Sequence, residues 1–179
     1  MKTVLPFGSN CLRPVTKTDA GKLLALLTTP EVRRFLCDDK ILTTPEIAAF
    51  LADSNRRDAE GLGLWVIETD AKDITGIASL MPVTGALEDI PEMAGGIEPT
   101  IALGPRFWRQ GLALRALAAV IDHARDTLCL SKLVASVDVP NKASHRLLRS
   151  CGFQKIGRSQ GVAHELILYV LPLKQLAAD

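Results

Sequence analysis

The chain has 179 residues, of which 47% are hydrophobic, and 21 basic against 20 acidic residues leave a net charge of +1. These totals fit one domain over residues 1–179 with a buried core, and they give no electrostatic reason to expect nucleic acid as the main partner. The four cysteines form no CxxC pair, so we expect neither a disulfide framework nor a metal site. Without a signal peptide or a membrane-length apolar segment, the expected location is cytoplasmic.

Strands and helices are predicted to alternate along the chain, which is typical of a three-layer α/β domain around a mixed sheet. Thr16 with Asp19 forms a capping-box-like helix start, and Thr44 is the expected N-cap of a second helix. Residues 82–96 are predicted to be a long loop, and Pro99 predicts a bulge or unpaired stretch because it lacks a backbone donor. The expected strands are 11–15, 64–68, 74–81, 97–103, 132–139, 153–158 and 164–171, with later helices over 110–127 and 141–151.

One central segment has the pattern of a strand, a glycine-bearing turn and a helix. Residues 100–103 lead through Gly104-Pro105 into 106–113, and apolar residues then recur at helical spacing, giving an expected buried stripe of Leu114, Leu117, Ala118 and Ile121. A helix that begins at such a turn directs unpaired N–H groups and its positive end at an anion such as pyrophosphate. Gly111 alone would favour an ordinary tight turn without a ligand.

Two separated motifs carry a family resemblance: Trp108-Arg109-Gln110-Gly111-Leu112-Ala113, and Asn141-Lys142-Ala143-Ser144 followed by Gly152-Phe153. With the opening Leu12-Arg13-Pro14 and Asp19, the chain resembles the GNAT superfamily of acetyl-CoA-dependent N-acetyltransferases. The match is closest to the branch of ribosomal-protein N-terminal alanine/serine acetyltransferases (RimJ/RimL-like). The resemblance implies an α/β (α+β) three-layer fold, with a central mixed, mostly antiparallel twisted sheet of six to seven strands flanked by about four helices. Leu148 stands where many members carry Tyr, and Arg115 where this branch usually carries Glu.

The resemblance implies acetyl-CoA as co-substrate and no metal. Backbone amides of residues 109–114 would hold the pyrophosphate, and the strand at 101–103 would pair with the pantetheine arm. The cations Arg106, Arg109 and Lys142 would meet phosphates, or are ordinary surface charges. Asn141 would bind the pantetheine amide, or only cap a helix. The expected cofactor-binding residues are Ile101, Ala102, Leu103, Arg106, Arg109, Gln110, Gly111, Leu112, Ala113, Leu114, Asn141, Lys142 and Ser144.

The reaction needs a neutral amine, so a base must remove a proton from the acceptor. Glu98 is one candidate and His164 another, because histidine side chains ordinarily exchange protons near neutral pH; Glu165 ranks behind them. Ser144 is predicted to face inward and is the first candidate to protonate or hydrogen-bond the cofactor sulfur. Tyr169 is the alternative acid.

These observations predict an N-acetyltransferase that moves acetyl to a primary amine by direct attack in a ternary complex. The N-terminal amine of a protein is the first expected acceptor, and a small-molecule amine is the second. A non-catalytic acyl-CoA-binding or interaction module on the same fold is the alternative function. We expect no nucleic-acid or membrane partner, and a monomer or homodimer.

Overall fold

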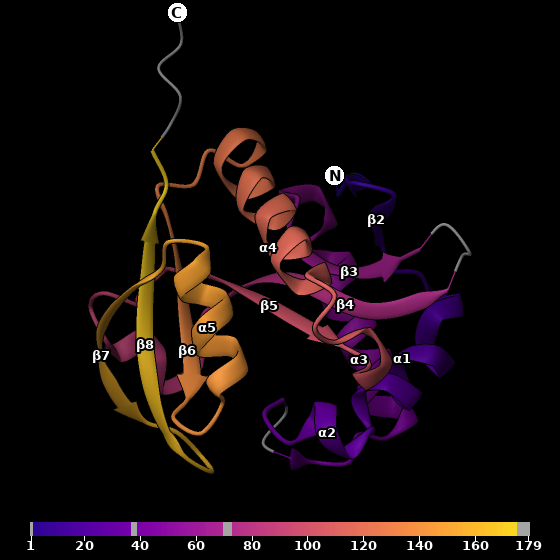
Figure 1. The fold of residues 1–179 in the computed structure, drawn as a ribbon, viewed down its shortest axis with the longest axis horizontal. Helices are drawn as coiled ribbons and strands as arrows, with labels where there is room; N and C mark the ends of the chain where they lie inside the picture. The colour runs from indigo at the N-terminus through magenta and orange to yellow at the C-terminus, as the bar shows by residue number, and fades with distance from the viewer. Residues whose placement is uncertain (1, 37–38, 70–72, 175–179) are drawn as a thin grey trace, which may run out of the picture.

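The computed structural model describes residues 2–36, 39–69 and 73–174, and these residues contain eight strands in two sheets (Figure 1). The strands are β1 Leu5–Phe7, β2 Asn10–Pro14, β3 Gly63–Glu68, β4 Ile74–Pro82, β5 Ile97–Leu103, β6 Lys132–Asp138, β7 Gln154–Gln160 and β8 Glu165–Pro172. The α-helices are α1 Ala20–Leu27, α2 Pro30–Arg33, α3 Thr44–Arg56, α4 Leu112–Asp122 and α5 Lys142–Ser150. The predicted three-layer α/β fold is confirmed.

The first sheet holds β1 to β5 in sequence order, and every neighbouring pair is antiparallel. Strand β3 is buried on both faces. Alternate side chains of a strand point to opposite sides of its sheet, so β3 contributes to two cores. Trp65 and Ile67 pack into a core shared with α4, whereas Leu64 and Val66 pack into a core shared with α1 and α3. This alternation places helices on both faces of the sheet.

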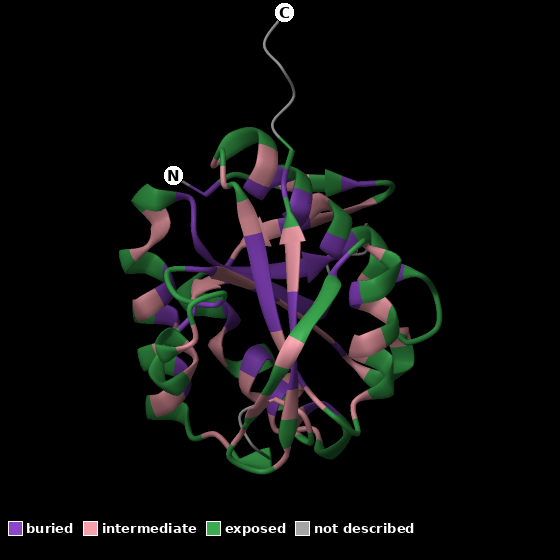
Figure 2. Ribbon diagram, turned by 90° about the vertical axis from the view of Figure 1, so that its left-hand side faces the viewer, coloured by how far each residue is buried: buried purple, intermediate pink, exposed green. Residues whose placement is uncertain are grey.

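The second sheet has the order β6-β8-β7, again antiparallel, with a register irregularity between Lys155 and Gly157. Its outer strand β7 is exposed along most of its length (Figure 2). Strands β5 and β6 lie next to each other but belong to different sheets, and among the described residues no ladder pairs them. The sheet surface therefore divides between β5 and β6, below the start of α4 (Figure 1).

Helix α4 buries a different face from the predicted one. Leu117 and Ile121 are buried as expected, but Leu114 is 42% exposed and Ala118 is exposed as well. The buried residues instead follow a repeat of Leu112, Ala116 and Val120. Placing Leu114 and Ala118 in the core was wrong, because a helix rich in Leu and Ala on every side does not fix its own buried face by spacing alone.

Strand β5 corrects the expectation for Pro99. All seven residues of β5 pair with β4 in continuous register, and Pro99 lies opposite Leu80. The predicted bulge is absent because β5 ends its sheet, so the proline nitrogen can face the unpaired edge.

Three local details also differ from the sequence-based expectations. The N-cap of α3 is Thr43 rather than Thr44, and it forms a capping box with Glu46 as Thr16 does with Asp19. Strand β1 was not anticipated. The expected loop 82–96 contains a 3₁₀ turn at Gly85–Asp89 (η4) and carries the fully buried Met93.

Within the described residues, no helix is both long and apolar enough to cross a membrane. In the same part of the chain, no three His, Cys, Asp or Glu side chains gather as they would around a metal ion. Cys11 and Cys151 are free thiols, and Cys37 lies outside the described residues.

Candidate active site

The loop before α4 has the backbone of an anion-binding nest. A 3₁₀ turn at Pro105–Phe107 (η5) follows β5, and Arg109 and Gly111 then adopt left-handed conformations with φ of 60° and 70°. Alternation of this kind turns successive N–H groups toward one point. Gly111 is the N-cap of α4 and contributes no side-chain cap, so the first N–H groups of the helix also have no partner within it.

Two side-chain contacts brace this loop. The Trp108 indole donates to the Leu103 carbonyl at 2.8 Å, which fastens the loop to the end of β5. The Gln110 amide donates to the Arg106 carbonyl at 2.9 Å. The loop is therefore held in shape by its own residues, with its backbone donors available to a ligand.

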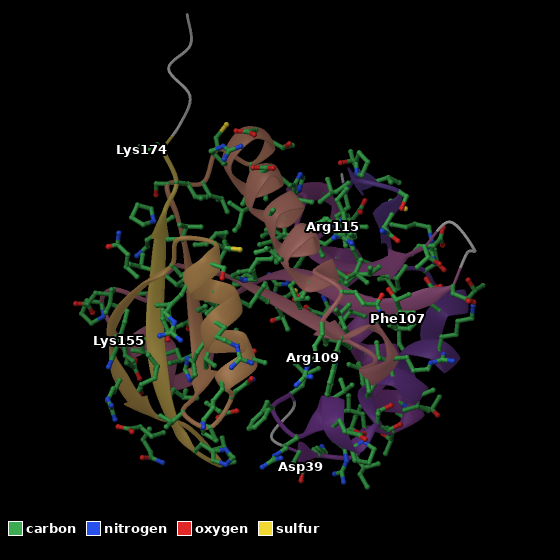
Figure 3. The ribbon with its side chains drawn as sticks, in the orientation of Figure 1. Asp39, Phe107, Arg109, Arg115, Lys155 and Lys174 are labelled. Atoms are coloured by element: carbon green, nitrogen blue, oxygen red, sulfur yellow. The ribbon has the colours of Figure 1, made fainter. Side chains whose placement is uncertain are left out.

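Three arginines surround the start of α4: Arg106, Arg109 and Arg115 (Figure 3 labels the last two). The first turn of the helix contains no acid, and none of the three arginines forms an ion pair with a described residue. Arg115 folds back and donates to the Gln110 carbonyl at 3.4 Å. Cations at the positive end of a helix are unfavourable unless an anion joins them, so these residues fit a phosphate-bearing cofactor.

Residues Ile101–Leu103 form the β5 segment that faces the division between the sheets. On one side they pair with Gly76–Ala78 of β4, and their other edge is not in a ladder. Such an edge can accept an extended ligand as an added strand. The structure therefore places this segment and the α4 nest next to each other, joined by the η5 turn.

Glu98 crosses the division between the two sheets. Its carboxylate accepts hydrogen bonds from the Ser136 backbone N–H and, at 2.9 Å, from the Ser136 hydroxyl on β6. Burial raises the pKa of the Glu98 carboxyl, and the two hydrogen bonds from Ser136 oppose that rise only in part. A carboxylate with a raised pKa at the end of a cofactor strand is suited to accept a proton.

His164, the residue before β8, lies near Asp138 at the end of β6. Its Nδ1 is 3.6 Å from a carboxylate oxygen of Asp138, and its ring lies 6.2 Å from that of Phe35, just after α2. Asp138 is two residues from Ser136, a rise of roughly 7 Å along a strand. Glu98 is hydrogen-bonded to Ser136 and His164 lies beside Asp138, so the two residues are near neighbouring positions of β6, although His164 Nδ1 has no hydrogen-bond partner among the described residues. Glu165 instead forms an exposed ion pair with Arg158 at 2.7 Å, which leaves it outside this group.

Asn141 is the N-cap of α5, and its side chain accepts the Ser144 N–H at 3.1 Å. Asn141 therefore has the capping role, and Ser144 is half-buried on the same side of the helix as the buried Leu148. Lys142 is exposed on another face of α5.

Tyr169 has a partner that the sequence did not indicate. Its hydroxyl lies 2.8 Å from Nδ1 of His145, whose Nε2 lies 3.1 Å from the Asp138 carbonyl. Because a carbonyl can only accept, Nε2 carries the proton and Nδ1 accepts from Tyr169. His145, Ser136 and Asp138 were all missed as site residues, since nothing in their local sequence links them to partners on other elements. The sequence indicated Arg115 only because the RimJ/RimL-like branch usually carries Glu at this position.

A divided α/β sheet with an anion-binding helix start at the division defines an acyl-CoA-type binding fold. A family model described as the acetyltransferase (GNAT) domain matches residues 10–154, and the chain belongs to this family. The resemblance inferred from the two motifs is confirmed at this level.

Solved structures of other acetyltransferases share the fold. A putative GNAT-family acetyltransferase from Bordetella pertussis has a TM-score of 0.82 at 19% identity, covering 94% of this chain and 99% of its own. RimL, a ribosomal L7/L12 α-N-protein acetyltransferase in complex with coenzyme A, has a TM-score of 0.79 at 15% identity, covering 96% and 98%. The spermidine N-acetyltransferase of Vibrio cholerae, in complex with CoA and spermine, has a TM-score of 0.73 at 17% identity, covering 92% and 96%.

A curated relative is similar over a shorter stretch. The uncharacterized N-acetyltransferase YoaA of Bacillus subtilis (strain 168) is 42% identical over 53 residues, which is 30% of this chain and 30% of that protein. The matched part therefore spans less than a third of that relative.

Proposed function

We propose that this protein is an acetyl-CoA-dependent N-acetyltransferase that acetylates a primary amine by direct attack in a ternary complex. The observation that carries the proposal is the juxtaposition of two features at one division of the sheet. One is the donor-rich, acid-free start of α4, and the other is the half-buried carboxylate of Glu98 on the adjoining strand, whose pKa is raised.

The cofactor would be held by residues on three elements. The N–H groups of the α4 nest and the three arginines bind its pyrophosphate, while the free edge of β5 aligns its pantetheine arm. Asn141 fixes the start of α5, so that Ser144 faces the same space. When bound, the cofactor supplies the activated acetyl thioester.

Proton handling is assigned to residues at the division of the sheets. Glu98 accepts the proton of the incoming amine, directly or through water, and His164 beside Asp138 is the second candidate for this task. Ser144 supplies a proton or hydrogen bond to the leaving sulfur. Tyr169 is the weaker candidate because its hydroxyl proton is already donated to His145.

We favour the N-terminal amine of a protein as acceptor and a small-molecule amine as the second possibility. The first follows from the sequence resemblance to the RimJ/RimL-like branch, and both kinds of acetyltransferase occur among the structural neighbours. The decisive assay measures thiol release from acetyl-CoA with a panel of peptides, polyamines and aminoglycosides. Turnover with peptides of free N-terminus, abolished by blocking that N-terminus, supports the proposal; tight CoA binding without turnover on any acceptor would favour the non-catalytic module.

A further inference from the structure

A basic hollow lies on the flank of α5 that faces β7, away from α4 (Figure 3 labels Lys155 on this flank). It has a volume of about 380 Å³. Three of its residues are long cations on α5 and a fourth reaches it from β7, with uncharged residues below; the lining consists of Lys142, His145, Arg146, Arg149, Lys155, Ile167 and Tyr169.

The positive charge of the hollow is not compensated by the protein. None of the lining residues is acidic, and none of the four long cations forms an ion pair with a described residue. Arg149 donates its Nε to the His145 carbonyl at 3.1 Å, which steadies the side chain and leaves its terminal nitrogens available. Like charges held within a Debye length repel one another, so binding an anion would relieve this repulsion.

The hollow is separate from the α4 nest and from Ser144, although Lys142, which the sequence resemblance assigns to the cofactor, is part of its lining. Lys142, Arg146 and Arg149 recur at spacings of three and four, so they share one face of the helix. Ser144 and Leu148 lie on another face, where Leu148 is buried in the main core. The wall formed by Lys155 belongs to β7, the strand furthest from β5 in the second sheet.

We propose that this hollow binds a small polyanion that carries phosphate groups, at a site distinct from that of acetyl-CoA. Arginine forks match phosphate oxygens in pairs, and lysines add point charges around them. A volume of about 380 Å³ suits a small molecule. Single-stranded nucleic acid would need an exposed aromatic platform, but Tyr169 is only 4% exposed. An acidic protein partner would need an apolar anchor near the centre, and Ile167 is buried.

The test uses the full chain saturated with coenzyme A, so that the cofactor site is filled, and titrates inorganic pyrophosphate by calorimetry. We expect saturable binding that weakens as salt is raised. Lys155→Gln and Arg149→Gln should each weaken it by about tenfold, since each removes a charge-assisted contact. Lys22→Gln, which neutralises an exposed lysine on α1, is the matched control and should leave the affinity unchanged.

Three outcomes would overturn the proposal. Failure of pyrophosphate to bind once coenzyme A is present would show that the anion binds only where the cofactor does. Equal binding by the Lys155 and Arg149 variants, with melting temperatures unchanged, would place the anion elsewhere. Tighter binding of polyglutamate or of an RNA oligonucleotide than of pyrophosphate would make the hollow a macromolecular surface. Affinity for coenzyme A, measured in the same samples, tests the proposed function independently.

Discussion

Glu98 combines three properties that suit a general base. Burial raises its pKa, two donors of Ser136 fix one of its oxygens, and it lies on β5 ahead of the cofactor segment of that strand. A solvated carboxylate is too weak a base to deprotonate an amine well, and a raised pKa brings the group nearer to the working pH. Its position on β5 and its environment therefore support the same role.

Glu98→Gln is expected to lower kcat/KM by about 10²- to 10⁴-fold, the usual contribution of a positioned general base. Wild-type activity should rise with pH through the raised pKa of Glu98, because only the carboxylate accepts a proton. The variant should lose that rise. Initial rates of thiol release across a pH series measure both effects, and Glu88→Gln, on the exposed η4 turn, is the control.

The same substitution should not destabilise the fold at neutral pH. A carboxyl whose folded pKa is raised contributes stability below its unfolded pKa, and this contribution is lost as pH rises through the folded value. Glutamine keeps an oxygen for Ser136 and has no charge, so its free energy of unfolding should equal or exceed that of wild type at neutral pH. Urea titrations at neutral pH measure this free energy. If Glu98→Gln lowers it, Glu98 has a structural role rather than the role of a base.

At the scale of the element, the first turn of α4 places a cation where the helix dipole disfavours one. Arg115 donates to the Gln110 carbonyl and approaches Gly111, where an added Cβ would lie 3.2 Å from its guanidinium. An acid at this position would be the more stable choice for the helix alone. We therefore expect Arg115 to contact the anion that the α4 nest binds.

Arg115→Glu should therefore separate stability from binding. We expect the free chain to gain about 0.3 to 1 kcal/mol from a favourable charge in the first turn. Affinity for acetyl-CoA should fall by about tenfold or more, since an anion then faces phosphate. Arg115→Gln should lie between wild type and Arg115→Glu in both thermal unfolding and calorimetric titration. Unchanged affinity in both variants would remove Arg115 from the cofactor site.

The elements themselves were largely predictable because their signals are local. The turn at Gly111, the cap at Asn141 and the strand over 97–103 all follow from neighbouring residues. The buried face of α4 was not predictable, since its apolar residues surround the axis. The pairs Glu98–Ser136 and His145–Tyr169 are 38 and 24 residues apart, and they depend on how elements distant in sequence pack together. The order of residues along the chain does not indicate how these elements pack together.

At the scale of the whole molecule, one core spans the division at which the site lies. Leu103 on β5, Leu112 at the start of α4, and Leu133 and Ile167 of the second sheet belong to the same buried cluster. The two sheets therefore share one apolar core, although no ladder joins β5 to β6 among the described residues. This packing can hold the unpaired edge of β5 in place without a ladder partner.

The first sheet has its own polar clamp, and we expect it to govern acid stability. Arg13 on β2 binds Asp19 at 3.0 Å and Glu68 of β3 at 2.8 Å. Burial alone would raise the pKa of Asp19, but hydrogen bonds from Arg13 and Thr16 outweigh it and lower that pKa. A group whose pKa is lowered in the folded state adds stability above its unfolded pKa, and this stability is lost as pH falls through the folded pKa.

Arg13→Met should cost roughly 2 to 3 kcal/mol of unfolding free energy at neutral pH, a value discounted for the partly exposed guanidinium. It should also reduce the loss of stability seen as the pH is lowered. Arg56→Met, which breaks an exposed pair with Asp53, should cost under about 1 kcal/mol. Urea unfolding at neutral and acid pH measures both variants, and an equal cost for the two would show that the Arg13 clamp is no stronger than a surface pair.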